Sequence, residues 1–511
     1  MNRLTLAFGR SGGRAFTFVW PLFFVLVDRC YGIGVLDMAN LALTVVAPRT
    51  VAQTELARTI AAIALASLIL MIPVIMNGFP FIFPDSADYL ICTPRYYFRS
   101  PFYGIWICFF HLYQFIWGPV VAQAVVGSHL LYLLFRTIHV PRLHLNLLLS
   151  ATLLAAFSSL PYFVGFIMPD IFTSYMAILL YLLGFQLTAL FPMERVYVLL
   201  LACVAVASHL SHLTLATLMV ALFVPVAYWA GYAWKSICQR TSILLLPAIL
   251  TCAAYLTFNV FVLHTFALSP AGPTFFLANL IEYGPAREYL HAACPQAGYK
   301  ICSEAATLPK TANDFLWHDD FLGRLGGFAG MAKESDRVVS DTIATRPWEI
   351  VTMSADNFLE SLNTHEPAKE LTPTYIPAWT PMFTVLDQKF GPRTVEEFRD
   401  SAQMKGTIPH TAIASIDRIS TPLAFVVLAV LTVYVAMRGQ RDLAAFAIFM
   451  CGGIFLDAWL CATLAGVYDR YQARMTWLLP MAAFAIAVTL KGRLRRLNSA
   501  SPSRPVARAG A

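Results

Sequence analysis

The chain has 511 residues, of which 58% are hydrophobic and 13% charged, and its formal net charge is +7. A soluble globular protein carries about 25% charged residues, so this composition excludes a purely soluble fold and indicates helices that face lipid. The modest positive charge does not require a nucleic-acid partner, because basic residues flank membrane spans on the cytoplasmic side. The sequence therefore predicts an all-α polytopic membrane protein.

The N-terminal region resembles neither a signal peptide nor a complete span. Residues 15–27 are apolar and follow Arg3, Arg10 and Arg14, but Asp28 interrupts the pattern. No small-residue cleavage site follows at the usual distance. We therefore predict a cytoplasmic or interfacial leader over residues 1–58.

Apolar runs of near 20 residues predict membrane-spanning helices, and lysine and arginine at their cytoplasmic ends orient them. These two rules predict about ten spans with both chain ends in the cytoplasm. The first outer loop, residues 77–118, contains a shorter apolar piece that is predicted to lie on the outer surface. The predicted spans are residues 59–76, 119–135, 145–163, 171–190, 196–209, 213–234, 243–266, 423–437, 443–466 and 477–490.

These spans divide the chain into five regions. The leader 1–58 precedes a transmembrane core over 59–268, which includes the first outer loop. A large outer domain, mixed or helical, is predicted over 269–421, because this length is too great for a bare connector. C-terminal transmembrane helices follow over 422–490, and a basic, disordered cytoplasmic tail over 491–511.

Two of the ten cysteines lie in the polar outer segment rather than in apolar runs. Cys294 and Cys302 are close in sequence, and the outer side of the membrane is oxidising, so we predict a disulfide between them. No cysteine or histidine spacing typical of a structural zinc site occurs.

Three acidic residues fall at the outer ends of predicted spans. Asp85 and Asp88 are three residues apart and would share a helix face, although Asp85 alone could also cap a helix. Asp170 ends a different span. Carboxylates that converge raise one another's pKa, which allows one of them to act as a general base near neutral pH. We therefore predict a shared catalytic site for these acids.

Basic residues occur at the same predicted ends. His209 and His212 could be hydrogen-bonded helix-end residues, could contact a phosphate, or could hold a divalent metal that binds one. Two histidines without a third ligand are weak grounds for a metal, so no cofactor is firmly predicted. Arg470 and Arg474 lie on one helix face at an outer end, where anion binding is favoured over snorkelling to lipid headgroups.

The stretch FPDSADYLICTPRYYFRSPFYGIW, residues 83–106, carries the acidic pair, then Arg99 and a Ser-Pro that begins a helix. Together with the later acid and the large outer segment, it resembles the GT-C class of membrane glycosyltransferases. This class includes the protein O-mannosyltransferases and the bacterial aminoarabinose transferases. The motif resemblance covers residues 75–170, is architectural over the rest and is absent from the first fifty residues.

The resemblance implies transfer of a sugar from a polyprenyl-phosphate donor to a lipid or polysaccharide acceptor. It places the site on the periplasmic face of a bacterial inner membrane. Asp85 or Asp88 would be the base, Asp170 a second acid, and Arg99 or the later arginine pair would hold the donor phosphate. The acids here are separated by two residues and RSPFY lacks a double proline, so the choice of base stays open.

Two other functions compete with this interpretation. A transporter for lipid-linked sugars would be expected to show internal repeats and broken midplane helices, and neither is evident in the sequence. A polysaccharide polymerase or ligase is the remaining alternative. A lipid-linked donor fits the absence of any nucleotide-binding glycine pattern in the sequence.

Overall fold

The structure is a computed structural model that describes residues 49–92, 99–318, 320–377 and 380–499. It divides into two compact units, residues 1–61 and 62–511. The described part of the first unit is the start of helix α3 (Arg49–Leu70). The predicted leader 1–58 therefore lies outside the described residues, except for its last ten, which belong to α3.

The described residues are helical, and their one isolated β-bridge pairs Phe81 with Phe166. Seven segments are long and apolar enough to cross a membrane, which supports a polytopic helical membrane protein. They are α3 from Gln53, α7 (Gly118–Thr137), α12 (Leu210–Trp229), α13 (Trp234–Val262), α23 (His410–Met437), α24 (Arg441–Leu464), and the joined α25 (Asp469–Thr476) and α26 (Leu478–Ser499).

Three further predicted spans correspond to shorter helices, namely α8 (Leu143–Phe157), α10 (Ile171–Phe185) and α11 (Pro192–Ala207). They have 15, 15 and 16 residues. At ~1.5 Å per residue such helices are shorter than the ~30 Å hydrocarbon core. All residues of α10 are buried, so it forms the centre of the bundle rather than a lipid-facing wall. The exact number of spans stays a prediction.

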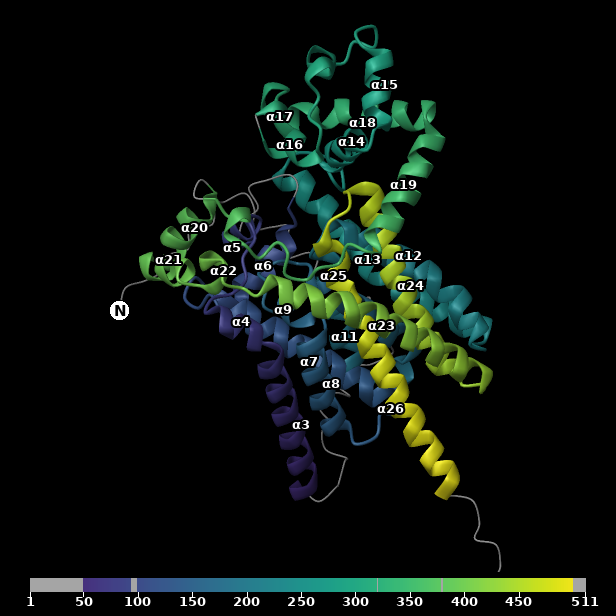
Figure 1. Cartoon of the computed structure of the whole chain (residues 1–511). Coiled ribbons are helices and arrows are strands. Elements are labelled where there is room, and N and C mark those ends of the chain that lie inside the picture. The colour runs from purple at the N-terminus through teal and green to yellow at the C-terminus, as the bar shows by residue number, and fades with distance from the viewer. Residues whose placement is uncertain (1–48, 93–98, 319, 378–379, 500–511) are drawn as a thin grey trace, which may run out of the picture. The chain divides into compact units, whose positions relative to one another are not determined.

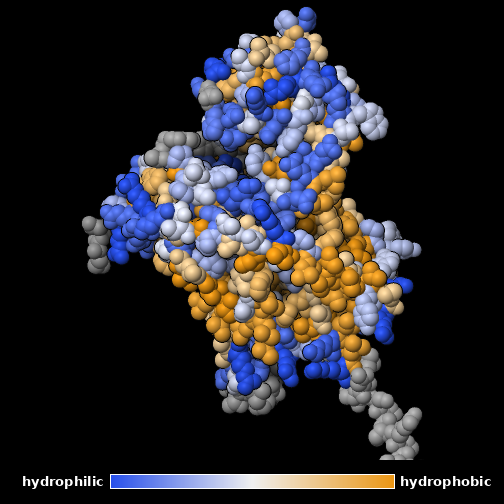
Figure 2. Space-filling model, viewed as in Figure 1, coloured by the Kyte–Doolittle hydropathy of each residue, from blue (hydrophilic) through white to orange (hydrophobic). Residues whose placement is uncertain are grey.

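Several helices present hydrophobic residues outward. Exposed leucine, isoleucine and valine side chains follow one another along α23, for example Leu423, Val430 and Val433. Figure 2 shows the hydrophobic surface gathered over the long helices, whereas the surface over α14 to α18 is largely hydrophilic. A broad exposed apolar surface of this kind is expected where helices contact lipid rather than water.

The segment between α13 and α23, whose helices are labelled in Figure 1, contains a hydrophobic core of its own, built from residues between Leu277 and Met353. The disulfide between Cys294 and Cys302, predicted from the sequence, is present there. The elements of this segment are α14 (Gly272–Glu282), α15 (Pro285–Ala293), η2 (Lys300–Thr307), α16 (Ala312–Trp317), α17 (Phe321–Arg324), α18 (Gly327–Thr345) and α19 (Pro347–Ser361).

The rest of the predicted outer domain packs differently. Leu371, Met382, Leu386 and Phe398 are buried in the main core with the transmembrane helices. The sequence range 269–421 therefore contains one segment with its own core and a second segment that covers the bundle. This second segment contains η3 (Pro373–Tyr375), α20 (Pro381–Phe390), α21 (Pro392–Arg399) and α22 (Ala402–Lys405).

The predicted tail also differs from the structure. Helix α26 continues to Ser499, so residues 491–499 are helical and the prediction of a disordered tail over this part is wrong. The physical reason is that lysine, arginine and leucine are good helix formers and extend a helix that is already nucleated in the membrane. Residues 500–511 lie outside the described part of the chain.

The loop that carries the first acids is held on both sides. Phe81 N donates to Gly165 O at 2.9 Å, and Ile167 N donates to Phe81 O at 3.0 Å. From α22, the buried side chain of Gln403 accepts from Ile82 N at 3.1 Å and donates to Ile82 O at 2.7 Å. This loop follows the short helix α4 (Ile72–Asn77) and precedes α5 (Ser86–Leu90) and α6 (Pro101–His111).

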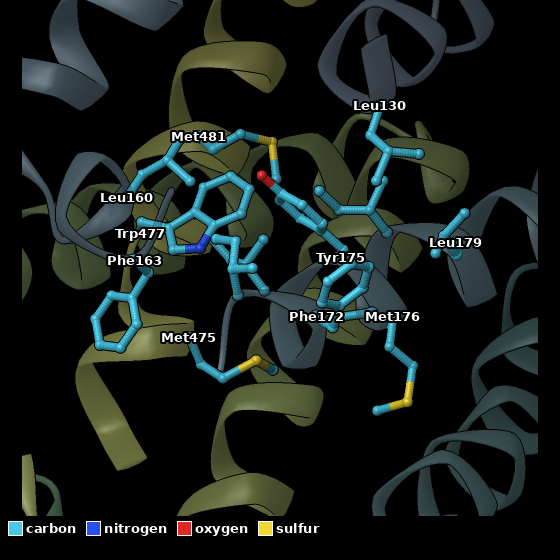
Figure 3. Close-up of a cluster of buried hydrophobic side chains, with 14 of the residues drawn as sticks. Leu130, Leu160, Phe163, Phe172, Tyr175, Met176, Leu179, Met475, Trp477 and Met481 are labelled. Carbon is cyan, nitrogen blue, oxygen red and sulfur yellow. The ribbon is translucent and has the colours of Figure 1, made fainter. Parts of the chain in front are cut away.

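Helix α25 is fixed by a buried aromatic cluster. Figure 3 shows side chains of α9 (Leu160–Val164), α10 and α26 gathered around Trp477. The indole Nε1 of this tryptophan donates to Ser174 Oγ at 2.9 Å, so its one polar atom is satisfied within the apolar core. The cluster thus sets the position of the helix turn that carries the two arginines.

The remaining element, η1 (Leu187–Ala189), joins α10 to α11.

Candidate functional site

The first group of charges lies on α5. Asp85 occupies the N-cap position, but its side chain makes no capping hydrogen bond and pairs with Arg99 instead. Arg99 Nε also lies 3.5 Å from Asp88 Oδ2. The spacing of three residues therefore places both carboxylates on one helix face, and one arginine bridges them.

The protonation of Asp88 differs from that of an ordinary aspartate. Burial raises the pKa of Asp88 to about 6, against the opposing charge of Arg99 and with a further contribution from Asp85. A carboxylate with such a pKa exchanges protons close to neutral pH, which is a property of general bases.

The second group of charges surrounds Asp170 at the start of α10. This carboxylate is buried and makes no side-chain capping bond. Its Oδ1 lies 3.4 Å from Arg474 Nη1 and 3.6 Å from Arg470 Nε. Both arginines project from one face of α25, as their spacing of four residues predicts.

Arg474 is fully committed to protein partners. It donates to Asp457 Oδ1 at 2.8 Å through Nη2 and to Asp457 Oδ2 at 3.2 Å through Nε. Asp457 lies in α24 and is completely buried. This bidentate pair fixes α25 against α24, so Arg474 is a positioning residue rather than a free anion ligand.

Arg470 has a different environment. Its Nε lies 3.5 Å from Glu370 Oε2, and its guanidinium stacks on the ring of Phe83 at 4.2 Å. Nε and Nη1 of this arginine, and Oε2 of the glutamate, are buried without a hydrogen-bond partner. Buried donors and acceptors of this kind are rare in native structures unless a ligand, ion or water completes them.

The two groups of charges lie close enough to act on the same side chains. The pKa of Tyr89 is raised by burial and by the charges of both Asp85 and Asp170. The pKa of Glu370 is also raised by burial and by these two aspartates. The acids that the sequence predicted to share a site therefore belong to one electrostatic centre.

The two histidines have separate situations. His212 donates from Nδ1 to Ala205 O at 2.8 Å and its Nε2 lies 2.7 Å from Thr173 Oγ1, so both ring nitrogens are used by the protein. His209 is the N-cap of α12, and its Nδ1 accepts from Ser211 N at 3.2 Å. Burial and the nearby arginines lower the pKa of His209 to about 3, so its ring is neutral and presents an Nε2–H donor.

A short segment covers the centre. We call residues 365–371 the cover segment. Lys369 Nζ donates to Asp469 Oδ2 at 2.5 Å, and Glu366 N donates to Asp469 Oδ1 at 2.9 Å. His365 Nδ1 lies 2.5 Å from Asp417 Oδ2. These contacts fasten the cover segment to the beginnings of α23 and α25.

A small cavity of about 10 Å³ lies beneath the cover segment. This volume is below the ~300–1,000 Å³ of typical small-molecule sites. The cavity is therefore too small for a small-molecule ligand in this conformation. It is lined by Phe163, Phe166, Glu366, Pro367, Glu370, Leu371 and Arg470.

One group of candidate metal ligands occurs among the described residues, formed by Cys92, Cys108 and His111. The two cysteines are joined in a disulfide, so their sulfur atoms are not thiolate ligands. Among the described residues, no third metal ligand accompanies His209 and His212, so the possibility that they hold a metal stays a prediction.

Sequence reasoning missed Glu370, Lys369 and Asp457. A signal existed for Asp457, because an aspartate inside the apolar run 443–466 is costly and marks a functional or paired residue. No comparable signal existed for the other two, which lie in a polar segment where charges are ordinary. The chain was compared with protein-family models, with curated proteins and with solved structures, and none of the three comparisons gives a match.

Proposed function

We propose that this protein is a membrane glycosyltransferase that moves a sugar from a polyprenyl-phosphate donor to a hydroxyl or amine acceptor. The observation that carries the proposal is Arg470, a buried guanidinium with two nitrogens that have no hydrogen-bond partner, beside a small cavity. It lies within one electrostatic centre with buried carboxylates. Such a centre can bind an anionic leaving group and accept a proton, which are the two requirements of this reaction.

In the proposed reaction, Asp88 accepts the proton of the acceptor. The freed electron pair attacks the anomeric carbon of the sugar, and the bond from this carbon to the phosphate oxygen breaks. The leaving polyprenyl phosphate gains one negative charge, which Arg470 Nε and Nη1 stabilise. Asp88 is proposed as the base because burial raises its pKa to about 6, close to neutral pH.

The other residues of the centre have supporting roles. Arg99 bridges the two acids of α5 and keeps their carboxylates on one side. Arg474 holds Asp170 and the arginine-bearing helix in place. His209 contributes a neutral N–H donor near the arginines of the centre. The cover segment must move for a sugar phosphate to enter, because the small cavity beneath this segment has no room for one.

The membrane topology completes the proposal. Asp85, Asp88, Asp170 and Arg470 lie near one end of the apolar helices. The basic residues Lys491, Arg493 and Arg495 lie at the other end of the last span. By the positive-inside rule, the basic end is cytoplasmic, so the centre faces the outer side of the membrane. The resemblance to the GT-C class implies that this side is the periplasm of a bacterial inner membrane. Lipid-linked sugars displayed at that surface provide a donor without a nucleotide.

The proposal is tested by a transfer assay with purified protein in lipid vesicles. Radiolabelled polyprenyl-phosphate sugars are supplied as a panel, with total membrane lipid and polysaccharide as acceptors. We expect the wild type to transfer label from at least one donor. The transfer rate of Asp88→Asn should be at least about 100-fold lower, which is the usual contribution of a general base. The matched control is Asp400→Asn, whose carboxylate is 77% exposed and pairs only with Lys405 among the contacts of described residues. If both variants transfer label at the same rate, Asp88 does not take part in the reaction. If the wild type uses none of the donors, the proposed function is wrong.

A further inference from the structure

A second disulfide, not predicted from the sequence, lies beside the candidate site. Cys92 follows the end of α5 and Cys108 lies in the last turn of α6, with their Cα atoms 5.7 Å apart. The bond closes a stretch of chain that includes Arg99, the residue that bridges the acids of α5. The disulfide thus joins the end of α5 to α6, and the Arg99 bridge joins the chain just before α6 to Asp85 and Asp88.

A histidine is directed at one of the two sulfur atoms. His111 is completely buried, and its Nδ1 accepts from the backbone N–H of Tyr113 at 3.0 Å. A neutral imidazole with an accepting Nδ1 carries its proton on Nε2. Nε2 lies 3.6 Å from Cys92 Sγ, so an N–H donor faces this sulfur.

The protonation of His111 is consistent with this arrangement. Burial lowers the pKa of the ring to about 4, so it is neutral at pH 7. The same tautomer argues against a metal at this group, because a protonated Nε2 has no lone pair for an ion. The geometry therefore favours a role in sulfur chemistry over a role in metal binding.

We propose that Cys92–Cys108 is an exchange-reactive disulfide, with His111 stabilising Cys92 as the leaving thiolate and a dithiol as the chemical partner. One thiolate of the dithiol attacks Cys108 Sγ, the Cys92–Cys108 bond breaks, and the electron pair remains on Cys92. The second thiol of the reagent then attacks the mixed disulfide and releases Cys108. Two electrons and two protons pass from the dithiol to the cysteine pair, and the reagent becomes a cyclic disulfide.

The physical reason is the dependence of exchange on the leaving group. Thiol–disulfide exchange is faster when the leaving thiol has a lower pKa. A hydrogen bond from His111 Nε2–H favours the thiolate form of Cys92 and thus lowers the barrier for cleavage in this direction. The bond has a defined polarity, because no corresponding donor to Cys108 is found among the described contacts.

The chain provides an internal control. The Cys294–Cys302 disulfide is also half-buried at both sulfur-bearing residues, like Cys92 and Cys108. Among the described contacts, no histidine ring nitrogen lies within hydrogen-bond distance of Cys294 or Cys302. The two disulfides therefore resemble each other in exposure and differ in the histidine.

The experiment measures both reduction rates in one sample of the full chain in detergent. Free cysteines are first blocked with N-ethylmaleimide, and limiting dithiothreitol is added at pH 8. Timed aliquots are quenched with isotope-labelled iodoacetamide, and peptide mass spectrometry reports each pair separately. We expect Cys92–Cys108 to be reduced at least about tenfold faster than Cys294–Cys302, which equals ~1.4 kcal/mol in the barrier.

Two variants test the role of His111. His111→Phe keeps an aromatic ring without a donor and should bring the rate ratio close to one. His111→Gln retains an N–H donor on a shorter side chain, so the ratio of the two reduction rates should be intermediate. Equal rates for the two disulfides in the wild type would overturn the proposal, as would a ratio unchanged in His111→Phe. If His111→Phe does not fold, the ratios in the wild type and in His111→Gln decide the outcome. None of these readouts requires transferase activity.

Discussion

Asp170 and Arg474 are 304 residues apart in the sequence, yet the carboxylate Oδ1 of one lies 3.4 Å from the guanidinium Nη1 of the other. Both side chains are almost completely buried. The contact joins the start of the central helix α10 to α25. Because Asp457 engages the same guanidinium, the arginine links three helices, and this link places Arg470 beside the cavity.

We expect the buried pair of Asp457 and Arg474 to contribute strongly to stability. Asp457→Asn removes the negative charge with little change in volume and leaves a buried guanidinium without its bidentate partner. The free energy of unfolding should fall by about 3 kcal/mol, the usual scale for breaking a buried ion pair. Denaturant unfolding of the purified protein in detergent, followed by tryptophan fluorescence, measures the change.

The control for this prediction is an exposed ion pair at the opposite end of the spans. Asp442 lies 2.5 Å from Arg493, and its side chain is half exposed. Asp442→Asn should change the free energy of unfolding by less than about 1 kcal/mol. Equal losses for the two variants would show that burial of the Asp457 pair is not what stabilises the arrangement.

Asp88 should make stability depend on pH. Its folded-state pKa of about 6 lies above the ordinary 3.8, so the folded state binds the proton more tightly than the unfolded state. The resulting stabilisation is fully present below pH 3.8 and is lost as pH rises through about 6. At pH 7.5 the ionised carboxylate therefore costs on the order of 2–3 kcal/mol.

This cost is measured by comparison with Asp88→Asn, which cannot ionise. At pH 7.5 the variant should unfold at a higher temperature than the wild type, and the difference should shrink as the pH is lowered to 5. Thermal unfolding at both pH values provides the result. A constant difference between the two proteins would mean that Asp88 does not titrate in this range.

The rate of the proposed transfer reaction should depend on pH through the same carboxylate, Asp88. Because the base must be ionised, kcat/KM should fall about tenfold per pH unit below the pKa of Asp88, about 6. The measurement is a profile of donor transfer between pH 5 and 8, with Asp400→Asn as the control that keeps the wild-type profile. A flat profile down to pH 5 would assign the proton transfer to another residue.

The fixed position of the acidic loop should depend on Gln403. Gln403→Ala removes both side-chain hydrogen bonds to the backbone of Ile82. Two buried backbone groups are then unsatisfied, which should cost about 2 kcal/mol or more. Hydrogen exchange should accelerate at residues 81–90, whereas Gln388→Ala, at an exposed position of α20, should leave it unchanged. Equal exchange in the two variants would contradict the proposed role of this glutamine.

Much of the fold could be predicted from the apolar pattern. Each predicted span overlaps a helix, because a run of apolar residues between charges indicates helix length and burial. Two of the spans were each predicted as one helix but contain two α-helices: span 59–76 covers the end of α3 and most of α4, and span 145–163 covers most of α8 and α9. Whether the short helices α8 and α10 cross the membrane was harder to predict, because a helix buried within the bundle need not cover the full thickness of the membrane. The Cys294–Cys302 disulfide was predictable because its cysteines are eight residues apart in a polar segment.

The site was predictable only in part. Asp85, Asp88 and Asp170 stood out because they follow apolar runs, and the structure places them in one electrostatic centre. The ion-pair partners of the charged site residues could not be predicted, because pairs such as Arg470 with Glu370 join residues far apart in the chain. A single sequence reveals charged residues that are unusual for their surroundings, but it does not reveal which distant residue neutralises them.

The most direct test of the proposed function is the binding of polyprenyl phosphate by the purified protein. The free lipid phosphate and the uncharged polyprenol are titrated into the wild type and Arg470→Ala, and native mass spectrometry follows the bound fraction. Arg393→Ala is the matched control, because this arginine is 90% exposed and pairs with Glu397. We predict that the wild type and Arg393→Ala prefer the phosphate by at least about tenfold, or ~1.4 kcal/mol, and that Arg470→Ala loses this preference. Equal affinity of the wild type for phosphate and polyprenol would contradict the assignment of Arg470 and, with it, the proposed transferase.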